Sequence, residues 1–218
     1  MDLIFLSAII GFLALDTTVA FQMLLSSPLF ACPILGWILG DIQTGFELGF
    51  LLQLLWLGRI PAGAVVFPEG NIASMVITSL VLLNKGIDFP NSTLAFAFLE
   101  GIIVSYLGAQ ITLIYRKING KTLNMVIKQV ENKNFKIILL LEAGSIILYF
   151  LIMFVFTWMV LLISQQILPI FIPKIGGFFE HQLIVVKPAI LGIGLAMAFP
   201  LIKDALSMNQ DKKNDRTY

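Results

Sequence analysis

Ionisable and amide side chains lie inside the long apolar stretches of this sequence. The carboxylates are Asp16, Asp41, Glu47, Glu100 and Glu142, and the amides are Gln22, Gln43, Gln53 and Gln110. An ionised group at the centre of a bilayer costs roughly 2.5–3.5 kcal/mol on insertion scales. Two explanations are open. The groups form hydrogen bonds between helices, worth about 0.6 kcal/mol each on average, or they line a polar path for a hydrophilic solute.

The densest group of polar residues falls between positions 41 and 53. If a helix begins near Asp41, its carboxylate can accept backbone N–H bonds from the first turn, and this capping role is an open alternative to a binding role. Thr44 lies three residues later, on the same side of the helix. Gln43 and Glu47 are four residues apart and share one helix face.

Gln53 has leucine pairs on both sides, so capping does not explain it. Its amide donates and accepts hydrogen bonds, as the hydroxyls of a sugar do. Trp56, three residues later, either packs against a sugar or anchors the chain at the membrane interface. The candidate substrate-binding residues are Asp41, Gln43, Thr44 and Gln53, followed by Gln22 and Asp16 of the first apolar segment.

Four further residues carry chemistry but stand outside any motif. Glu100 and Glu142 are single carboxylates in long apolar runs, where they either couple transport to protons or pair with a neighbouring chain or with Lys187. His181 falls in an expected outer loop, and Cys32 lies in an apolar segment with no second cysteine in the chain. We therefore expect no catalytic residue, metal ion or cofactor.

The composition decides the class of protein. Of the 218 residues, 58% are hydrophobic and only 12% are charged, with a mean hydropathy of +0.94. A soluble domain carries about 25% charged residues, so this chain lacks the polar surface of a soluble enzyme. The apolar runs are long and continuous, unlike the short alternating strands of an outer-membrane barrel. The fold class expected is an all-α integral membrane protein, a multi-span helical bundle with short re-entrant or broken helical hairpins.

The apolar segments differ in length. Those at 93–115, 137–163 and 183–202 are long enough to span a bilayer, and that at 3–25 is long enough only if Asp16 is tolerated inside it. Segments 28–40 and 46–58 are too short to cross alone, and a polar turn separates them. They predict a re-entrant hairpin over about 28–58, a feature that marks substrate sites in transporters. Segment 165–175 is also short, and two prolines are expected to interrupt it. The whole is expected to form one membrane domain over 1–206, with a polar cytoplasmic tail at 207–218.

The basic residues indicate an orientation. Residues 116–136 contain six Lys or Arg and one Glu, whereas residues 1–115 contain two basic and seven acidic residues. Basic residues accumulate in cytoplasmic loops of membrane proteins. We therefore expect a basic cytoplasmic loop at 116–136 and a cytoplasmic tail. A nucleic-acid role for this loop is disfavoured, because it is short and lacks clustered aromatic residues.

Three sequence blocks resemble one family. Residues 28–45, PLFACPILGWILGDIQTG, are similar to the first signature of the mannose–fructose–sorbose family of phosphotransferase-system (PTS) IIC components. Residues 49–58 (GFLLQLLWLG) and 61–74 (PAGAVVFPEGNIAS) are similar to the next two blocks, with matching spacing. Residues 187–197 resemble a later segment. The chain departs from the family pattern in its short C-terminal part, in Glu100 where a proline is common, and in Gln53 where Glu is frequent.

The resemblance implies a function. IIC components of this family form the sugar-translocating part of a phosphoenolpyruvate-dependent system in the bacterial inner membrane, as multi-pass proteins. The implied partners are a IID membrane component, cytoplasmic IIA and IIB phosphocarriers, the sugar and the lipid bilayer, in an oligomeric complex without nucleic acid. No phosphorylation site is expected in the IIC chain itself. An ion- or proton-coupled small-solute transporter and a truncated, non-transporting membrane scaffold remain the alternatives.

Overall fold

The computed structural model describes residues 2–57 and 68–214, with side chains described as far as residue 203. Its elements are α1 (Leu3–Thr18), α2 (Pro28–Ile38), α3 (Ile42–Trp56), α4 (Gly70–Leu83), α5 (Pro90–Glu131), α6 (Phe135–Phe179), a short 3₁₀ helix (Gln182–Val185) and α7 (Val186–Asn214). Throughout those two ranges the regular structure is helical. The expected all-α fold class is confirmed.

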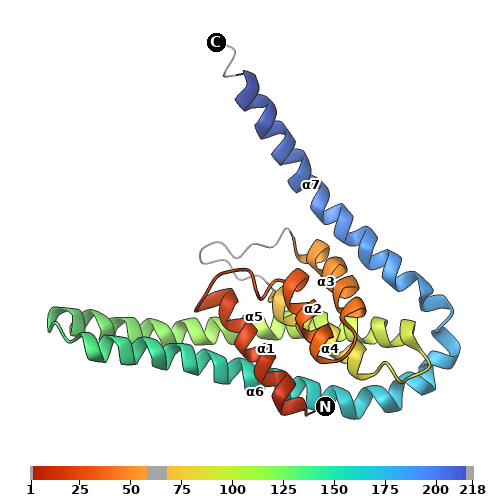
Figure 1. Cartoon of the computed structure of the whole chain (residues 1–218), viewed down its shortest axis with the longest axis horizontal. Coiled ribbons are helices and arrows are strands. Elements are labelled where there is room, and N and C mark those ends of the chain that lie inside the picture. The colour runs from red at the N-terminus through yellow and green to blue at the C-terminus, as the bar shows by residue number, and fades with distance from the viewer. Residues whose placement is uncertain (1, 58–67, 215–218) are drawn as a thin grey trace.

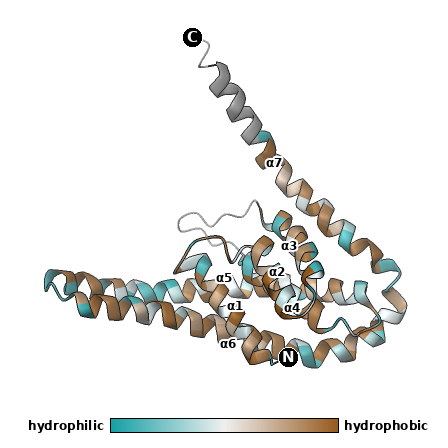
Figure 2. Ribbon diagram, viewed as in Figure 1, coloured by the Kyte–Doolittle hydropathy of each residue, from teal (hydrophilic) through white to brown (hydrophobic). Residues whose placement is uncertain are grey.

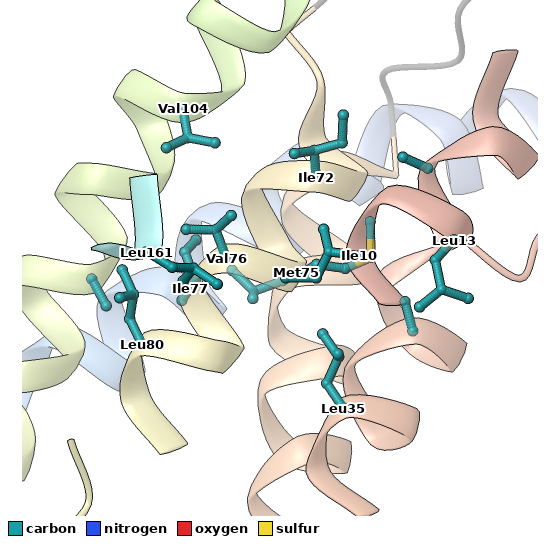
Figure 3. Close-up of a cluster of buried hydrophobic side chains, with 14 of the residues drawn as sticks. Ile10, Leu13, Leu35, Ile72, Met75, Val76, Ile77, Leu80, Val104 and Leu161 are labelled. Atoms are coloured by element: carbon teal, nitrogen blue, oxygen red, sulfur yellow. The ribbon is translucent and has the colours of Figure 1, made fainter. Parts of the chain in front are cut away.

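Helix α4 forms the centre of the molecule. Its residues from Ile72 to Leu80 are all buried, since no side chain of the helix carries a charge. In Figure 3, Ile10 and Leu35 lie on one side of α4, and Val104 and Leu161 lie on the other. α1 and α2 therefore pack against one face of α4, and the long helices α5 and α6 pack against the opposite face.

Helices α5 and α6 form a long antiparallel pair (Figure 1). They contain 42 and 45 residues, which correspond to about 63 and 67 Å at 1.5 Å per residue. A bilayer core is about 30 Å thick, so both helices extend well beyond one crossing. Among the residues that the structure describes, three helical segments are long and apolar enough to cross a membrane, at Pro90–Glu131, Phe135–Phe179 and Gln182–Lys203.

Two expectations about these helices were wrong. Residues 116–136 are not a loop: α5 continues to Glu131, and the turn before α6 covers only residues 132–134. The Lys, Leu, Met and Gln residues of this segment are good helix formers, and the charges lie on the exposed side. Pro169 and Pro173 do not interrupt α6 either. Both prolines are exposed, and a spanning helix tolerates proline where neighbouring groups satisfy the freed backbone.

Helices α2 and α3 form the expected helical hairpin, and glycines allow their backbones to touch. A Cβ atom added to Gly45 would lie 2.7 Å from the Cys32 carbonyl oxygen, and one added to Gly49 would lie 2.7 Å from the Pro28 carbonyl oxygen. Small residues at helix interfaces permit such close approach in lipid. Gly40, with φ at 83°, makes the turn between the helices. Whether the hairpin re-enters the bilayer remains a prediction.

The first apolar segment is shorter as a helix than its composition suggested. α1 ends at Thr18, and residues 19–27 form an irregular loop. Three non-glycine residues in this loop, Phe21, Gln22 and Leu24, have positive φ angles of 66°, 51° and 65°. Such backbone is sparsely populated and persists only where surrounding contacts hold it.

Helix α7 leaves the body at the end of the α5–α6 pair (Figure 1). It packs against α3, where Gly194 lies against Leu54 and Lys187 pairs with Glu47. Figure 2 shows apolar residues along the exposed length of α5 and α6, and polar residues toward the turn between them. This surface pattern is that of helices surrounded by lipid or by other membrane chains.

Candidate functional site

The structure separates the candidate site residues into two groups at opposite ends of α3. Asp41, Gln43 and Thr44 lie at its start, and Gln53 lies near its end. Twelve residues of helix place Asp41 and Gln53 about 18 Å apart. The structure therefore does not bring Gln53 together with Asp41, Gln43 and Thr44, because most of α3 lies between them.

At the start of α3, Asp41 has a structural role. Its Oδ1 accepts the Thr44 backbone N–H at 3.1 Å, and its Oδ2 accepts the Thr44 hydroxyl and the Lys85 ammonium, both at 2.6 Å. The Lys85 hydrogen bond, followed by those from Thr44, holds the pKa of the Asp41 carboxyl well below its usual range. This is the capping geometry that competed with the binding interpretation. Gln43, beside it, is exposed.

A cavity of about 220 Å³ lies beside this end of the hairpin. Thr44 and Glu47 of α3 line it together with Asn84 and Lys85, which follow α4, and with Lys187 of α7. Glu47 and Lys187 form an ion pair across it. Two ion pairs thus join α3 to α7 and to the loop after α4.

At the other end of α3, Gln53 contacts the start of α2. Its Oε1 accepts the Leu29 backbone N–H at 3.3 Å, one of the first-turn donors that α2 cannot satisfy itself. Sequence reasoning missed this contact because it joins residues 24 positions apart. Trp56, one turn later, packs on Gly70, where an added Cβ would lie 2.4 Å from the indole Cδ2.

Asp16 organises the loop next to this end. Its carboxylate accepts the backbone N–H groups of Met23 at 2.6 Å and Ser26 at 2.9 Å, and the Ser26 hydroxyl at 3.1 Å. Asn71 of α4 donates from Nδ2 to the Ser26 Oγ at 3.1 Å. Gln22 lies in the same loop but is exposed.

These contacts link the end of α3 to the start of α2 and to the start of α4. Ser26 is three residues from Leu29, which Gln53 contacts, and Asn71 follows Gly70, which Trp56 contacts. We call this group, made up of Asp16, Ser26, Gln53, Trp56 and Asn71, the Gln53 cluster. Its amides and hydroxyls can donate and accept, and its indole offers an apolar face, which is a combination suited to a polyhydroxylated solute.

Of the two single carboxylates, Glu100 has a partner that the sequence did not reveal. Glu100 accepts a hydrogen bond from the Ser164 hydroxyl of α6, so the expected partner in another chain or at Lys187 is not needed there. Lys187 pairs with Glu47 instead. Glu142 is exposed. Among the residues that the structure describes, no group of three His, Cys, Asp or Glu side chains is placed to hold a metal ion.

Glu180 is a polar contact that sequence reasoning did not single out. Its carboxylate accepts the backbone N–H groups of Asn91 at 2.7 Å and Ser92 at 2.8 Å, and the Ser92 hydroxyl at 2.7 Å. Burial raises the pKa of the Glu180 carboxyl, but the hydrogen bonds from Ser92 and Asn91 outweigh burial and lower it. The end of α6 thus caps the start of α5. The Pro90-Asn91-Ser92 sequence signals a helix start, but not which carboxylate caps it.

Comparison with protein families gives one match over almost the whole chain. The sequence model of the PTS system sorbose-specific IIC component matches residues 1–206. The chain is 30% identical over 119 residues to the sorbose-specific EIIC component of Klebsiella pneumoniae, covering 55% of this chain and 42% of that protein. It is 29% identical over 121 residues to the mannose-specific EIIC component of Escherichia coli K12, covering 56% and 43%. These alignments span less than half the length of either relative.

The alignment with the fructose permease IIC component of Bacillus subtilis is longer. The two chains are 28% identical over 180 residues, which covers 80% of this chain and 63% of that protein. A solved structure described as a membrane protein is 25% identical, with a TM-score of 0.70 over 92% of this chain and 77% of its own. The cryo-EM structure of the mannose transporter ManYZ with microcin E492 is similar in fold, with 23% identity and a TM-score of 0.60 over 99% of this chain and 83% of its own.

Proposed function

This chain belongs to the family of PTS sorbose-specific IIC components, and from that premise we propose that it is the sugar-translocating membrane subunit of a phosphoenolpyruvate-dependent phosphotransferase system. It passes a hexose-type sugar through the bacterial inner membrane. A cytoplasmic IIB component phosphorylates the sugar on its arrival, after receiving the phosphoryl group from IIA. A IID membrane component completes the translocating complex.

The observation that carries this proposal is the meeting of three separate sequence blocks at the Gln53 cluster. Residues 28–45 supply α2, residues 49–58 supply Gln53 and Trp56, and residues 61–74 supply Asn71. The first-turn contact from Gln53 to Leu29 and the packing of Trp56 on Gly70 join these blocks. A helix bundle requires no such convergence of amide, hydroxyl and indole groups. Sugar binding does, because each hydroxyl needs both a donor and an acceptor when it leaves water.

We place the proposed sugar site at the Gln53 cluster, near the end of α3, rather than at the start of α3 beside Asp41 and Thr44. Asp41 and Thr44 use their polar atoms on each other and on Lys85. Asp16 uses both carboxylate oxygens to hold the loop at 19–27. We therefore propose Gln53 and Asn71 as direct sugar ligands, with Asp16 as a positioning residue. Gln43 and Gln22 are exposed and have no assigned part in this site.

Uptake measurements test the function. In cells that express the chain with the IID, IIB and IIA genes of its neighbourhood, we expect uptake of one sugar from a panel of mannose, fructose, sorbose and N-acetylglucosamine. The sugar should accumulate as its phosphate, and uptake should stop when the phosphoenolpyruvate supply is removed. Uptake that continues without phosphoenolpyruvate and delivers free sugar would contradict the proposal and favour an ion-coupled transporter.

We also propose that the turn between α5 and α6 faces the cytoplasm, because six basic residues surround it in 116–136. A cysteine-free variant carrying Lys121→Cys should resist a membrane-impermeant maleimide applied to intact cells and react after the cells are opened. Lys85→Cys is the matched control from the opposite end of α5, and should react in intact cells. Labelling of position 121 from outside would reverse the assigned orientation.

A further inference from the structure

A second cavity, of about 520 Å³, lies between the end of α1 and the α5–α6 pair. Arg116, Asn119 and Thr122 of α5 line it, opposite Glu142 and Ser145 of α6. Val19 closes it on the α1 side. We call it the fork cavity. It shares no lining residue with the cavity at the hairpin tip and contains none of the residues assigned to the Gln53 cluster.

The lining of the fork cavity suits a neutral solute with many hydroxyl groups. Arg116 supplies donors, Glu142 supplies acceptors, and the Asn119 amide and the Thr122 and Ser145 hydroxyls supply both. The charges of Arg116 and Glu142 balance within the lining. Because Glu142 already balances the Arg116 guanidinium, the lining has no net positive charge to offset the dehydration of the dianionic group of a phosphorylated sugar, and the neutral sugar is favoured.

A series of polar contacts begins at the wall of this cavity. The Ser145 hydroxyl donates to Asn119 Oδ1 at 2.5 Å and lies 2.8 Å from the Tyr115 hydroxyl. The ring of Tyr115 packs against that of Tyr149, with the two centroids 4.7 Å apart. The Tyr149 hydroxyl in turn lies 3.4 Å from the Thr112 hydroxyl.

The same stretch of α5 reaches the segment before α4. The Glu69 backbone N–H donates to the Ser105 carbonyl oxygen at 2.9 Å, and Glu69 stands two residues before Asn71 of the Gln53 cluster. Hydroxyl and aromatic groups of α5 and α6 therefore occupy the interval between the fork cavity and the part of α5 that Glu69 contacts. Tyr149 is fully buried in the middle of this set, so the connection is closed in the conformation seen here.

We propose that the fork cavity is a second, inner binding station for the unphosphorylated sugar, separated from the Gln53 cluster by the Tyr115–Tyr149 pair. This inference rests on the proposed function and extends it. The sugar leaves the Gln53 cluster, passes the tyrosine pair and is held at Arg116, Asn119, Glu142 and Ser145. Phosphorylation follows beyond this cavity, because the cavity selects the neutral form.

Equilibrium binding to the chain co-purified with its IID component in lipid nanodiscs tests this assignment. The probes are radiolabelled mannose, fructose, sorbose and N-acetylglucosamine, with mannose 6-phosphate as competitor. For the sugar that binds, we expect two sites per chain. Ser145→Ala and Glu142→Ala should each weaken one site by about tenfold to a hundredfold, as for a lost hydrogen bond to ligand. Gln53→Leu should weaken the other site.

The controls separate the possible failures. Glu131→Ala, on the same helix as Arg116 but outside the cavity lining, should leave both sites unchanged, and mannose 6-phosphate should displace no sugar from the inner site. Retained binding at the Gln53 cluster in the Ser145→Ala chain shows that this chain is folded. A single site that disappears with Gln53→Leu would overturn this inference and leave the proposed function standing. A preference of the inner site for the phosphate would overturn the neutral assignment, and no sugar binding at all would overturn both proposals.

Discussion

Replacing Gln53 by leucine is expected to abolish sugar uptake while most of the protein still assembles in the membrane. Leucine fits the aliphatic surroundings of this helix, so packing changes little. The substitution removes the amide group proposed to bind the sugar, and a lost hydrogen bond to an uncharged ligand costs roughly 1–3 kcal/mol, or about tenfold to a hundredfold in affinity. It also removes the acceptor for the Leu29 backbone N–H, which should lower stability by about 1 kcal/mol.

Gln53→Glu is the matched variant. Glutamate keeps the acceptor that α2 uses and has the same length, and it is the residue that the resembling family often carries at this place. We expect it to retain binding through its carboxylate oxygens, although with altered affinity. Binding should be measured with the sugar identified by uptake, beside the melting temperature of each chain. If Gln53→Leu binds sugar as the wild type does and only melts earlier, the amide is a helix cap and the sugar binds elsewhere.

The sequence predicted the α2–α3 hairpin correctly, but it left the role of Asp41 within that hairpin open. The hairpin was predictable because its signals are local: a polar turn, paired small residues and two short apolar runs. The role of Asp41 was one of two local possibilities, and the cap was realised because Thr44 lies within its reach. Lys85, which completes the contact, comes from 44 positions away, and sequence alone gives no such pairing.

The predictions of where the long helices are interrupted were wrong for a different reason. Residues 116–136 were expected to form a loop because basic residues accumulate in the cytoplasmic loops of membrane proteins. Charge reports only that a segment lies outside hydrocarbon, while helix propensity decides its conformation. For α6 the error was of another kind: the prolines at 169 and 173 were expected to interrupt segment 165–175, but the helix runs through both.

The polar contacts of Glu100 and Asp16 also bear on whether these carboxylates couple transport to protons. Glu100 and Asp16 looked alike in the sequence, as single acids in apolar runs. One is bound to a serine of the neighbouring long helix, and the other holds an irregular loop. Each carboxylate therefore has a structural contact that accounts for its position without a coupling proton.

Asp16→Ala is expected to be the most destabilising substitution among the candidate site residues. The Asp16 side chain is 4% exposed, and its removal leaves the backbone N–H groups of Met23 and Ser26 without their acceptor. A hydrogen bond to a charged group contributes about 1.5–3 kcal/mol, so two or three such losses amount to about 3 kcal/mol or more. The positive φ angles at Phe21 and Leu24 are held by these contacts and should relax.

For a chain of this size, about 3 kcal/mol corresponds to a fall in melting temperature of roughly 6–12 °C. Asp16→Asn keeps one carbonyl acceptor and should fall between the wild type and Asp16→Ala, while Asp88→Ala, at an exposed position, should melt as the wild type does. Thermal unfolding in nanodiscs, followed by size-exclusion chromatography, measures all three. Because Asp16 positions Ser26 and through it Asn71, sugar affinity should fall together with stability. An Asp16→Ala chain with unchanged melting temperature and lost binding would show instead that Asp16 contacts the sugar directly.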